Sequence, residues 1–383
     1  MKRGLGKFKQ IFEYSGRKQI ISYVLIIMII IFGLEGITRG YQYFGTTCTF
    51  LETDVYPDLD YFEKKQICED ARMIKAKHVP LTEHIPNQHT STFNVNNYGF
   101  RGPDITLEKP DETFRIFTVG SSTTRGAGSS SDSTTMAGFL QYYLEKDDLP
   151  VRIEVINAGM NSYFSLWESE LIKNKILKFS PDVIIAYSGF ADLDTGLEYH
   201  KGKKYQTSII DKIIEKTFEI SPEIQSLQVI RKVQADFRKD TQIQALDPVL
   251  DDPISLKSSE TTEKVQMWKD RWIEICNLGK EKNFDTLIFL QPIAGGGNKI
   301  LSDMENAAYE KTTKYYVNDY KKFALELNEL NNHCTGVKDL RNVFDDYSYT
   351  IFTDGIHTVD GGNRLVAEEM YSMVLPIIQE KKK

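Results

Sequence analysis

The sequence predicts an α/β protein in which helices cover both faces of a parallel sheet, preceded by one N-terminal transmembrane helix. Short apolar runs alternate with longer helical patterns from residue 113 onward, an order typical of parallel strands joined by crossover helices. The runs are almost continuously apolar, as expected of strands buried on both faces. A separate apolar stretch at 20–37 predicts the transmembrane helix.

Residues 20–37 are predicted to be a transmembrane signal anchor. Apart from Glu35, its only polar side chains are Ser22 and Tyr23. Eighteen helical residues span roughly 27 Å, enough for a thin bilayer. A cleaved signal peptide and a buried core helix are the alternatives. The first lacks an A-x-A-like cleavage site after the run, and the second is disfavoured because apolar residues surround the whole helix.

Charge separates the N-terminus from the rest of the chain. The whole chain carries −7, whereas residues 1–19 hold six Lys or Arg and the single acid Glu13, so the remainder carries −12 (−7 minus +5). A basic flank stays in the cytoplasm. We therefore predict that 1–19 is a cytoplasmic tip and that the body lies outside the cytoplasm. The acidic body also argues against binding to nucleic acid.

Residues 40–112 are predicted to form an extracytoplasmic neck, and 113–383 a globular domain. Five strands are expected in this domain, at 114–119, 151–156, 183–187, 285–290 and, more weakly, 337–340. The helical patterns lie at about 133–146, 165–178, 262–282, 303–331 and 361–379. A helical segment at about 197–250 interrupts the alternation. We interpret it as an insertion that either packs on the body or shapes access to a site.

Four cysteines follow the anchor, an even number that permits two disulfides outside the cytoplasm. A bond between Cys48 and Cys68 would staple the neck, and one between Cys276 and Cys334 would join two elements of the domain. The alternative is four buried thiols. No C-x-x-C pair occurs, which argues against a cysteine-based zinc site.

A candidate nucleophile lies in the loop at 120–126, directly after the first strand. Ligand sites in open parallel sheets lie at the carboxyl ends of strands. The loop sequence, GSSTTRG, matches neither a P-loop, nor a dinucleotide-binding loop, nor the G-x-S-x-G elbow. It places Ser122 near a helix start. Such a serine is a nucleophile if a base removes its proton, or it simply forms the turn or caps the helix.

His357 is the candidate base among the six histidines. It lies in a loop that leads into the last helix, and Asp354 precedes it by three residues. A carboxylate at this spacing can hold the imidazole tautomer and stabilise the imidazolium; the alternative is a helix-entry aspartate beside a surface histidine. The spacings of His78, His84 and His89 fit no common metal site, so no metal is predicted.

Four short motifs occur in an order that resembles the SGNH, or GDSL-like, hydrolase family of esterases and lipases, in its membrane-anchored form. They are GSST at 120–123, NAG at 157–159, SGFAD at 188–192 and DGIH at 354–357, with a family-like lead-in, NYGFRG, at 97–102. The resemblance covers about 94–375. It implies a flavodoxin-like three-layer α/β/α fold with a five-stranded parallel sheet, and a hydrolase-like domain at 113–383. It implies no cofactor and no metal.

The resemblance also implies catalytic roles for single residues. Ser122 would attack an ester carbonyl, His357 would take and return the proton, and Asp354 would orient His357. The oxyanion would bind the backbone N–H groups of Ser122 and Gly159.

The third motif departs from the family pattern. Ala191 stands where the family carries an asparagine that donates a side-chain hydrogen bond to the oxyanion. Loss of one such donor lowers the rate by roughly 10²–10³. Asn161, two residues after Gly159, is the nearest candidate replacement.

The sequence therefore predicts an extracytoplasmic serine esterase that acts on O-acyl groups of an envelope glycan or lipid, or on another small ester-bearing molecule. Two alternatives remain. The same residues could pass the acyl group to a sugar hydroxyl, as an O-acyltransferase. The protein could also be a catalytically impaired binding or scaffold protein, an alternative that Ala191 raises. The expected partners are the ester substrate and the membrane, through 20–37, with no nucleic acid.

Overall fold

The computed structural model describes residues 20–37, 51, 55–77, 82–202 and 253–381. The chain divides into two units, and each is described by itself. Within the described residues the first unit holds only the helix Ile20–Ile37, whose length of 18 residues and mean hydropathy of 2.6 suffice to cross a membrane. The predicted tip at 1–19, Cys48, and the predicted insertion beyond residue 202 lie outside the described residues.

The second unit is built on a five-stranded sheet in which all neighbouring strands are parallel. The strands lie in the order β6-β5-β7-β8-β9, the flavodoxin-like arrangement in which chain order reverses between β5 and β7. Each lies within one residue of its predicted position. Their bounds are Thr113–Gly120 (β5), Arg152–Asn157 (β6), Val183–Ser188 (β7), Asp285–Leu290 (β8) and Gly336–Asp339 (β9).

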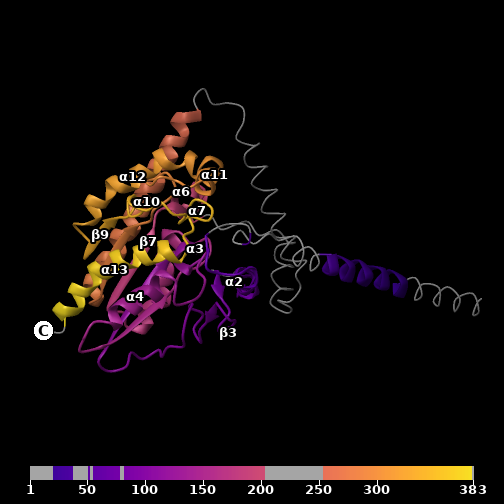
Figure 1. Ribbon diagram of the computed structural model, residues 1–383, viewed down its shortest axis with the longest axis horizontal. Coiled ribbons are helices and arrows are strands. Elements are labelled where there is room, and N and C mark those ends of the chain that lie inside the picture. The colour runs from indigo at the N-terminus through magenta and orange to yellow at the C-terminus, as the bar shows by residue number, and fades with distance from the viewer. Residues whose placement is uncertain (1–19, 38–50, 52–54, 78–81, 203–252, 382–383) are drawn as a thin grey trace, which may run out of the picture. The chain divides into compact units, whose positions relative to one another are not determined.

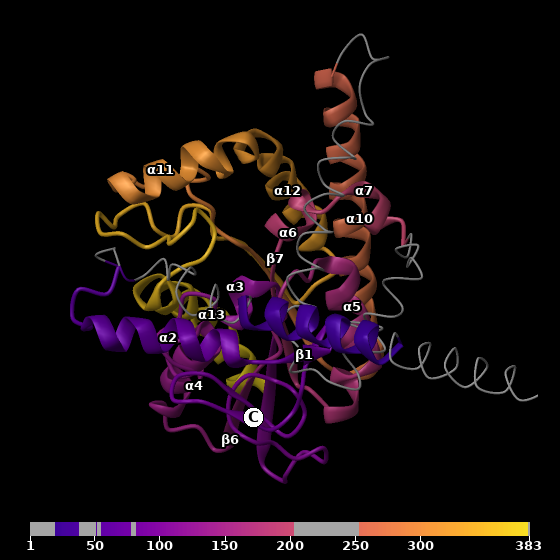
Figure 2. The ribbon, with the colours of Figure 1, turned by 90° about the vertical axis from the view of Figure 1, so that its right-hand side faces the viewer.

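Helices cover both faces of this sheet and complete three layers (Figure 1). One face carries α4 (Met136–Glu145) and α13 (Asp360–Lys381), which contact each other. The other carries α5 (Ser165–Asn174), α10 (Pro253–Lys282) and α12 (Val317–Leu330). Figure 2 shows α4 and α13 on the opposite side of the strands from α5 and α10. The predicted three-layer α/β/α fold is confirmed.

Short helical segments follow several strands and join the layers. Their bounds are Ser122–Arg125 (α3), Ile176–Phe179 (η1), Phe190–Asp194 (α6), Leu197–His200 (α7), Asp303–Lys311 (α11) and Thr313–Tyr315 (η2). Two predicted helices are therefore shorter than expected. The pattern at 165–178 gives α5 followed by the 3₁₀ turn η1, and the pattern at 303–331 is broken between α11 and α12.

The break between α11 and α12 has a local cause at two threonines. The Thr313 hydroxyl donates to the carbonyl oxygen of Ala294 (2.9 Å), and the Thr312 hydroxyl donates to that of Ala308 (2.6 Å). Threonine side chains that bond to backbone groups compete with regular helix geometry. Because Ala294 lies in a loop after β8, a helical pattern alone could not predict this break.

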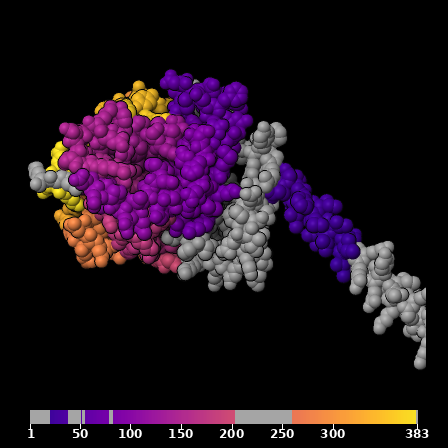
Figure 3. Space-filling model, turned by 90° about the horizontal axis from the view of Figure 1, so that it is seen from below, coloured from indigo at the N-terminus to yellow at the C-terminus, as the bar shows by residue number. Residues whose placement is uncertain are grey.

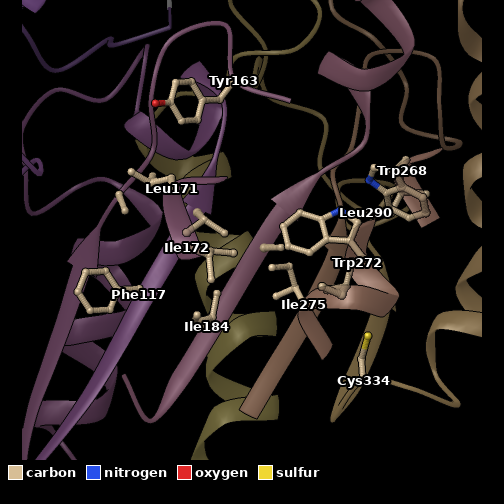
Figure 4. Packing of buried hydrophobic residues seen from close by; sticks show 14 of the residues in the cluster. Phe117, Tyr163, Leu171, Ile172, Ile184, Trp268, Trp272, Ile275, Leu290 and Cys334 are labelled. Carbon is tan, nitrogen blue, oxygen red and sulfur yellow. The ribbon is translucent and has the colours of Figure 1, made fainter. Parts of the chain in front are cut away.

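Two tryptophans of α10 fill the core between the sheet and the layer formed by α5 and α12. Trp268 and Trp272 are completely buried, and Figure 4 shows the Trp272 ring close to Ile275 and Leu290. Cys276, one turn further along α10, forms a disulfide with Cys334, one of the two pairings that the sequence left open against buried thiols. This bond ties α10 to the segment between α12 and β9. Cys68 is also disulfide-bonded.

The part of the predicted neck that the structure describes belongs to the same unit as the sheet. It contains α2 (Tyr61–Met73), β1 (Ala76–Lys77), β2 (Glu83–His84), β3 (Gln88–His89) and β4 (Asn94–Val95). Arg101 bridges to Asn157 at the end of β6, and Phe100 is fully buried in the main core. In the space-filling view this indigo-to-purple segment is continuous with the magenta surface of the sheet unit (Figure 3).

Candidate active site

Ser122 lies at the carboxyl end of β5, beside the point where the chain order reverses. The strand ends at Gly120, where an added Cβ would lie 2.5 Å from the carbonyl oxygen of Tyr187, so only glycine fits. Ser121, with extended backbone, is the N-cap of α3, and the helix ends at Gly126 in the left-handed region. Ser122 is thus the first helical residue. The N–H groups of a first helical turn have no acceptor within the helix, and that of Ser122 is one of them.

The loop before α13 carries the other two predicted catalytic residues. The Oγ atom of Ser122 lies 2.7 Å from Nε2 of His357, and Nδ1 of His357 lies 2.7 Å from Oδ2 of Asp354. The Asp354 carboxylate also accepts the backbone N–H of His357 (3.0 Å) and of Ile356 (3.3 Å), which closes a tight turn. The structure therefore brings the three residues together in series.

Backbone bonds hold this turn in place. The N–H of Ala294, in the loop after β8, donates to the carbonyl of Gly355 (2.8 Å), and the N–H of Thr353 donates to that of His357 (2.9 Å). Phe352 and Thr358 pair across the base of the turn. The turn is thus fixed by the loop after β8 and by its own backbone pairs, and the imidazole by its carboxylate partner, which favours a single orientation.

The pKa of Asp354 lies below its usual value because of His357. Partial burial acts to raise this pKa, but the hydrogen bond and charge interaction with the His357 side chain, together with the two backbone N–H donors, outweigh it. The carboxylate is therefore ionised at neutral pH and can orient an imidazole through Nδ1.

A substrate can reach these residues from solvent. Ser122 is half-buried, and the side chains of His357 and Asp354 are 17% and 48% exposed. A hydroxyl that shares a short hydrogen bond with an imidazole can lose its proton to that imidazole as it attacks an electrophilic carbon. The arrangement can therefore support nucleophilic catalysis.

The groups predicted to bind the oxyanion differ in their surroundings. The N–H of Gly159 already donates to Oδ1 of Asn157 (3.0 Å). Asn161 is exposed, and its side chain forms no hydrogen bond within the described part of the chain. Ala191, in α6, is half-buried and offers only a methyl group.

Ser162 is a candidate that sequence reasoning missed. It follows β6 in the same loop as Gly159, and its φ of +59° is rare for a residue with a side chain. Its backbone N–H has no acceptor among the described residues. Backbone strain of this kind is enriched at active sites, although Asn87 has the same φ outside the site. A serine carries no signal for positive φ, so only the structure could reveal it.

A buried acidic pair lies beneath the third motif. Asp192 accepts the Ser165 N–H (3.1 Å), and Glu168 accepts the Ser188 hydroxyl (2.9 Å). Burial raises the pKa of both carboxyls, and the charge of Asp192 raises that of Glu168 further. Arg271 lies 3.9 Å from Asp192. The network fixes α5 beneath the turn that carries Ala191, and Glu168 was not singled out from the sequence.

In the described ranges, no group of three or more His, Cys, Asp or Glu side chains is placed to hold a metal ion. His84 is buried, whereas His89 is exposed and its Nδ1 lies 3.3 Å from Oδ1 of Asn94. His78 lies outside the described residues.

Comparison with known proteins finds similarity among solved structures. No protein-family model and no curated protein matches the chain. An acetyl xylan esterase, AlAXEase, is 15% identical, with 68% of this chain and all of that one covered and a TM-score of 0.41. TesA is 10% identical (69% and 99% covered, TM-score 0.40). A protein from Parabacteroides merdae described as a GDSL-like lipase is 14% identical (68% and 96% covered, TM-score 0.39). At these values the function must be inferred from Ser122, His357 and Asp354 themselves.

Proposed function

We propose that this protein is a serine esterase that hydrolyses carboxylic esters with Ser122, His357 and Asp354. The observation that supports the proposal is the hydrogen-bonded series from Ser122 Oγ to His357 to Asp354, with 2.7 Å at each step. Nucleophile, base and orienting carboxylate in this order are the requirement for activating a serine hydroxyl.

The proposed reaction has two halves. Ser122 Oγ bonds to the carbonyl carbon while its proton passes to Nε2 of His357. His357 then gives that proton to the alcohol oxygen as the C–O bond breaks, which leaves an acyl-serine. Water repeats the sequence: it loses a proton to His357 and attacks the acyl carbon. The carboxylic acid then leaves as the proton returns to Ser122 Oγ.

The negative charge that develops on the carbonyl oxygen needs donors beside Ser122. We propose the N–H of Ser122 as one, because the first N–H of a helix has no acceptor within the helix. The oxyanion role of Gly159 stays a prediction, since its N–H would have to leave Asn157. We favour the N–H of Ser162, which has no acceptor in the described chain. Because Ala191 supplies no side-chain donor, we expect the turnover number to be lower than a third donor would allow.

The proposed substrates are O-acyl groups on an envelope glycan or lipid, or other small esters. Support comes from the apolar helix Ile20–Ile37 and the six basic residues before it. A signal anchor with a basic cytoplasmic flank would hold the sheet unit outside the cytoplasm, close to the membrane. Substrates of the cell envelope would then be within its reach.

One alternative has a specific observation in its favour. Ala191 removes a donor that serine hydrolases of this kind use, as expected of a catalytically impaired binding protein. Acyl transfer to a sugar hydroxyl shares every step up to the acyl-serine. The two enzymatic outcomes therefore differ only in the acceptor.

The test uses the full-length protein in detergent and 4-nitrophenyl acetate as substrate. We expect steady turnover, and loss of at least a thousandfold in Ser122→Ala. Ser121→Ala, the same change one residue earlier, is the matched control and should stay within a few-fold of the parent. Turnover that survives Ser122→Ala would exclude the proposed nucleophile. Added methyl glucoside distinguishes the outcomes, because a transferase would form acetylated sugar in preference to acetate.

A further inference from the structure

Arg125, the last residue of α3, is a buried cation with neither an acidic partner nor a hydrogen-bond partner for its side chain among the described residues. The residue is 8% exposed. It forms no ion pair and no side-chain hydrogen bond anywhere in the described chain. Nε is completely enclosed, whereas the two terminal nitrogens keep contact with solvent. The terminal nitrogens of the guanidinium can therefore donate hydrogen bonds to a group that approaches from solvent.

The surroundings of Arg125 contain no compensating acid. Its guanidinium carbon lies 5.1 Å from the centre of the Phe93 ring, and that of Arg101 lies 3.9 Å from the same ring. Arg101 is already paired with Asp132 (2.7 Å). Burial, together with repulsion from Arg101, lowers the pKa of Arg125 to about 10, so it is still charged at neutral pH.

His84 and Lys175 also leave the charge of Arg125 uncompensated. His84 packs edge-on against Phe93, and its Nδ1 is enclosed without a hydrogen-bond partner. Burial, then repulsion from Arg125, lowers the pKa of His84 to about 3, so this ring is neutral. Lys175 is neutralised by Glu83 (2.8 Å). We define the Arg125 cluster as His84, Phe93, Arg101 and Arg125, and at neutral pH it carries one unpaired positive charge.

An unpaired buried charge is expensive for a folded protein, because it loses its hydration and gains no counter-ion. Nothing in the described structure requires this guanidinium for a contact, apart from the Phe93 ring. Arg101, not Arg125, holds the end of α3, since its Nη1 donates to the carbonyls of Arg125 and Gly126 (3.0 Å each). The absence of an acid beside the Arg125 guanidinium therefore suggests that a bound anionic ligand supplies the negative charge.

The position of Arg125 links this charge to the proposed reaction. It lies three residues after Ser122 in the same helical turn, a spacing that puts the two Cβ atoms about 5–6 Å apart on one side of a helix. The backbone of Arg125 also abuts Gly159, in the loop that carries Ser162. A substrate whose carbonyl lies at Ser122 would reach the guanidinium with an anion that extends from the carbonyl toward the Phe93 ring.

Building on the proposed esterase function, we propose that Arg125 determines specificity by binding an anionic group of the ester substrate. The chemical class is a carboxylate, or an equivalent oxyanion, on either the alcohol side or the acyl side of the ester. Arginine suits such a group because its planar fork donates two parallel hydrogen bonds.

The experiment compares two matched pairs of esters. On the alcohol side, O-acetylated methyl glucuronide is paired with O-acetylated methyl glucoside; on the acyl side, 4-nitrophenyl hemisuccinate is paired with 4-nitrophenyl butyrate. We expect the protein to favour the anionic member of at least one pair. Arg125→Gln should lower that preference about 10- to 100-fold and change the neutral ester by less than threefold. Arg125→Lys should retain part of the preference, and Arg364→Gln, a surface control, all of it.

A second measurement does not depend on ester hydrolysis. Sodium glucuronate or sodium succinate should raise the melting temperature of the parent protein more than glucose at the same ionic strength, and should not do so in Arg125→Gln. If no ester is hydrolysed but this shift is present, the esterase proposal fails and the anion site stands. The anion site is overturned if neither salt shifts the parent protein. It is also overturned if Arg125→Gln keeps the parent's preference, or slows both members of a pair equally.

Discussion

The Nε2 atom of His357 lies 2.7 Å from the Oγ atom of Ser122, although 235 positions separate the two residues in the chain. The topology explains the encounter. Ser122 follows the strand at which the chain order reverses, and the turn that carries His357 is bonded to the loop after β8. Both lie at the carboxyl edge of one parallel sheet, where such folds place their ligands.

Asp354→Asn should lower kcat by about 10²–10⁴ and change KM little, because the amide favours the wrong imidazole tautomer and cannot stabilise the imidazolium. Steady-state kinetics with 4-nitrophenyl acetate measure the effect. Asp346→Asn, an exposed acid eight positions earlier, is the control and should match the parent. A kcat within threefold of the parent in Asp354→Asn would contradict the orienting role.

Ala191→Asn should raise kcat, by up to about 10²–10³ if the amide reaches the oxyanion in full. KM should change little, because the new hydrogen bond forms with charge that appears only in the transition state. A leucine side chain is branched like that of asparagine but has no hydrogen-bond donor, so Ala191→Leu should give no increase in kcat. If both variants behave alike, position 191 does not face the oxyanion in this protein.

Ser162→Gly should keep kcat within about threefold, because glycine adopts φ of +59° without strain and retains the N–H. Ser162→Val should lower kcat, since a β-branched residue disfavours that conformation and would turn the N–H away. Asn87→Val is the matched control. Asn87 has the same φ of +59°, lies in the described neck segment, and its replacement should reduce stability without reducing kcat. Equal kcat in Ser162→Val and Ser162→Gly would remove Ser162 from the proposed oxyanion site.

His84 should make the folded protein sensitive to acid. Burial lowers its pKa from 6.5 to about 3, so between these values the unfolded chain binds a proton that the folded chain does not. The free energy of unfolding therefore falls as the pH is lowered through this window. Between pH 7 and 4.5 the contribution is on the order of 2 kcal/mol.

Denaturant unfolding at the two pH values tests this prediction. His84→Gln should lose less stability on acidification than the parent, and His89→Gln, which replaces an exposed histidine, should lose as much as the parent. An equal loss in the parent and in His84→Gln would show that His84 does not carry the effect.

The sheet was predictable because its five strands are buried on both faces and are therefore nearly continuous apolar runs. The pairing of Asp354 with His357 was also predictable, since three residues separate them in one turn. The break at Thr312 and Thr313 was not, because the Thr313 hydroxyl bonds to the carbonyl oxygen of Ala294, which lies 19 positions earlier in another loop.

The Arg125 cluster could not be predicted for a different reason. A sequence shows that an arginine is present, but whether an acid pairs with it depends on which side chains the fold brings near. Ser162 shows the same limit for the backbone: positive φ is common for glycine, and nothing in a serine signals it. In both cases local sequence and tertiary surroundings disagree, which is typical of functional sites.

The central claim is that Ser122 is an activated nucleophile, and covalent labelling tests it most directly. The full-length protein is treated with a fluorophosphonate probe at neutral pH, and the modified residue is identified by mass spectrometry of its peptides. We predict a single adduct on Ser122 that is absent from Ser122→Ala and strongly slowed in His357→Ala. An adduct on another residue, or labelling of Ser122→Ala at the parent's rate, would contradict the claim.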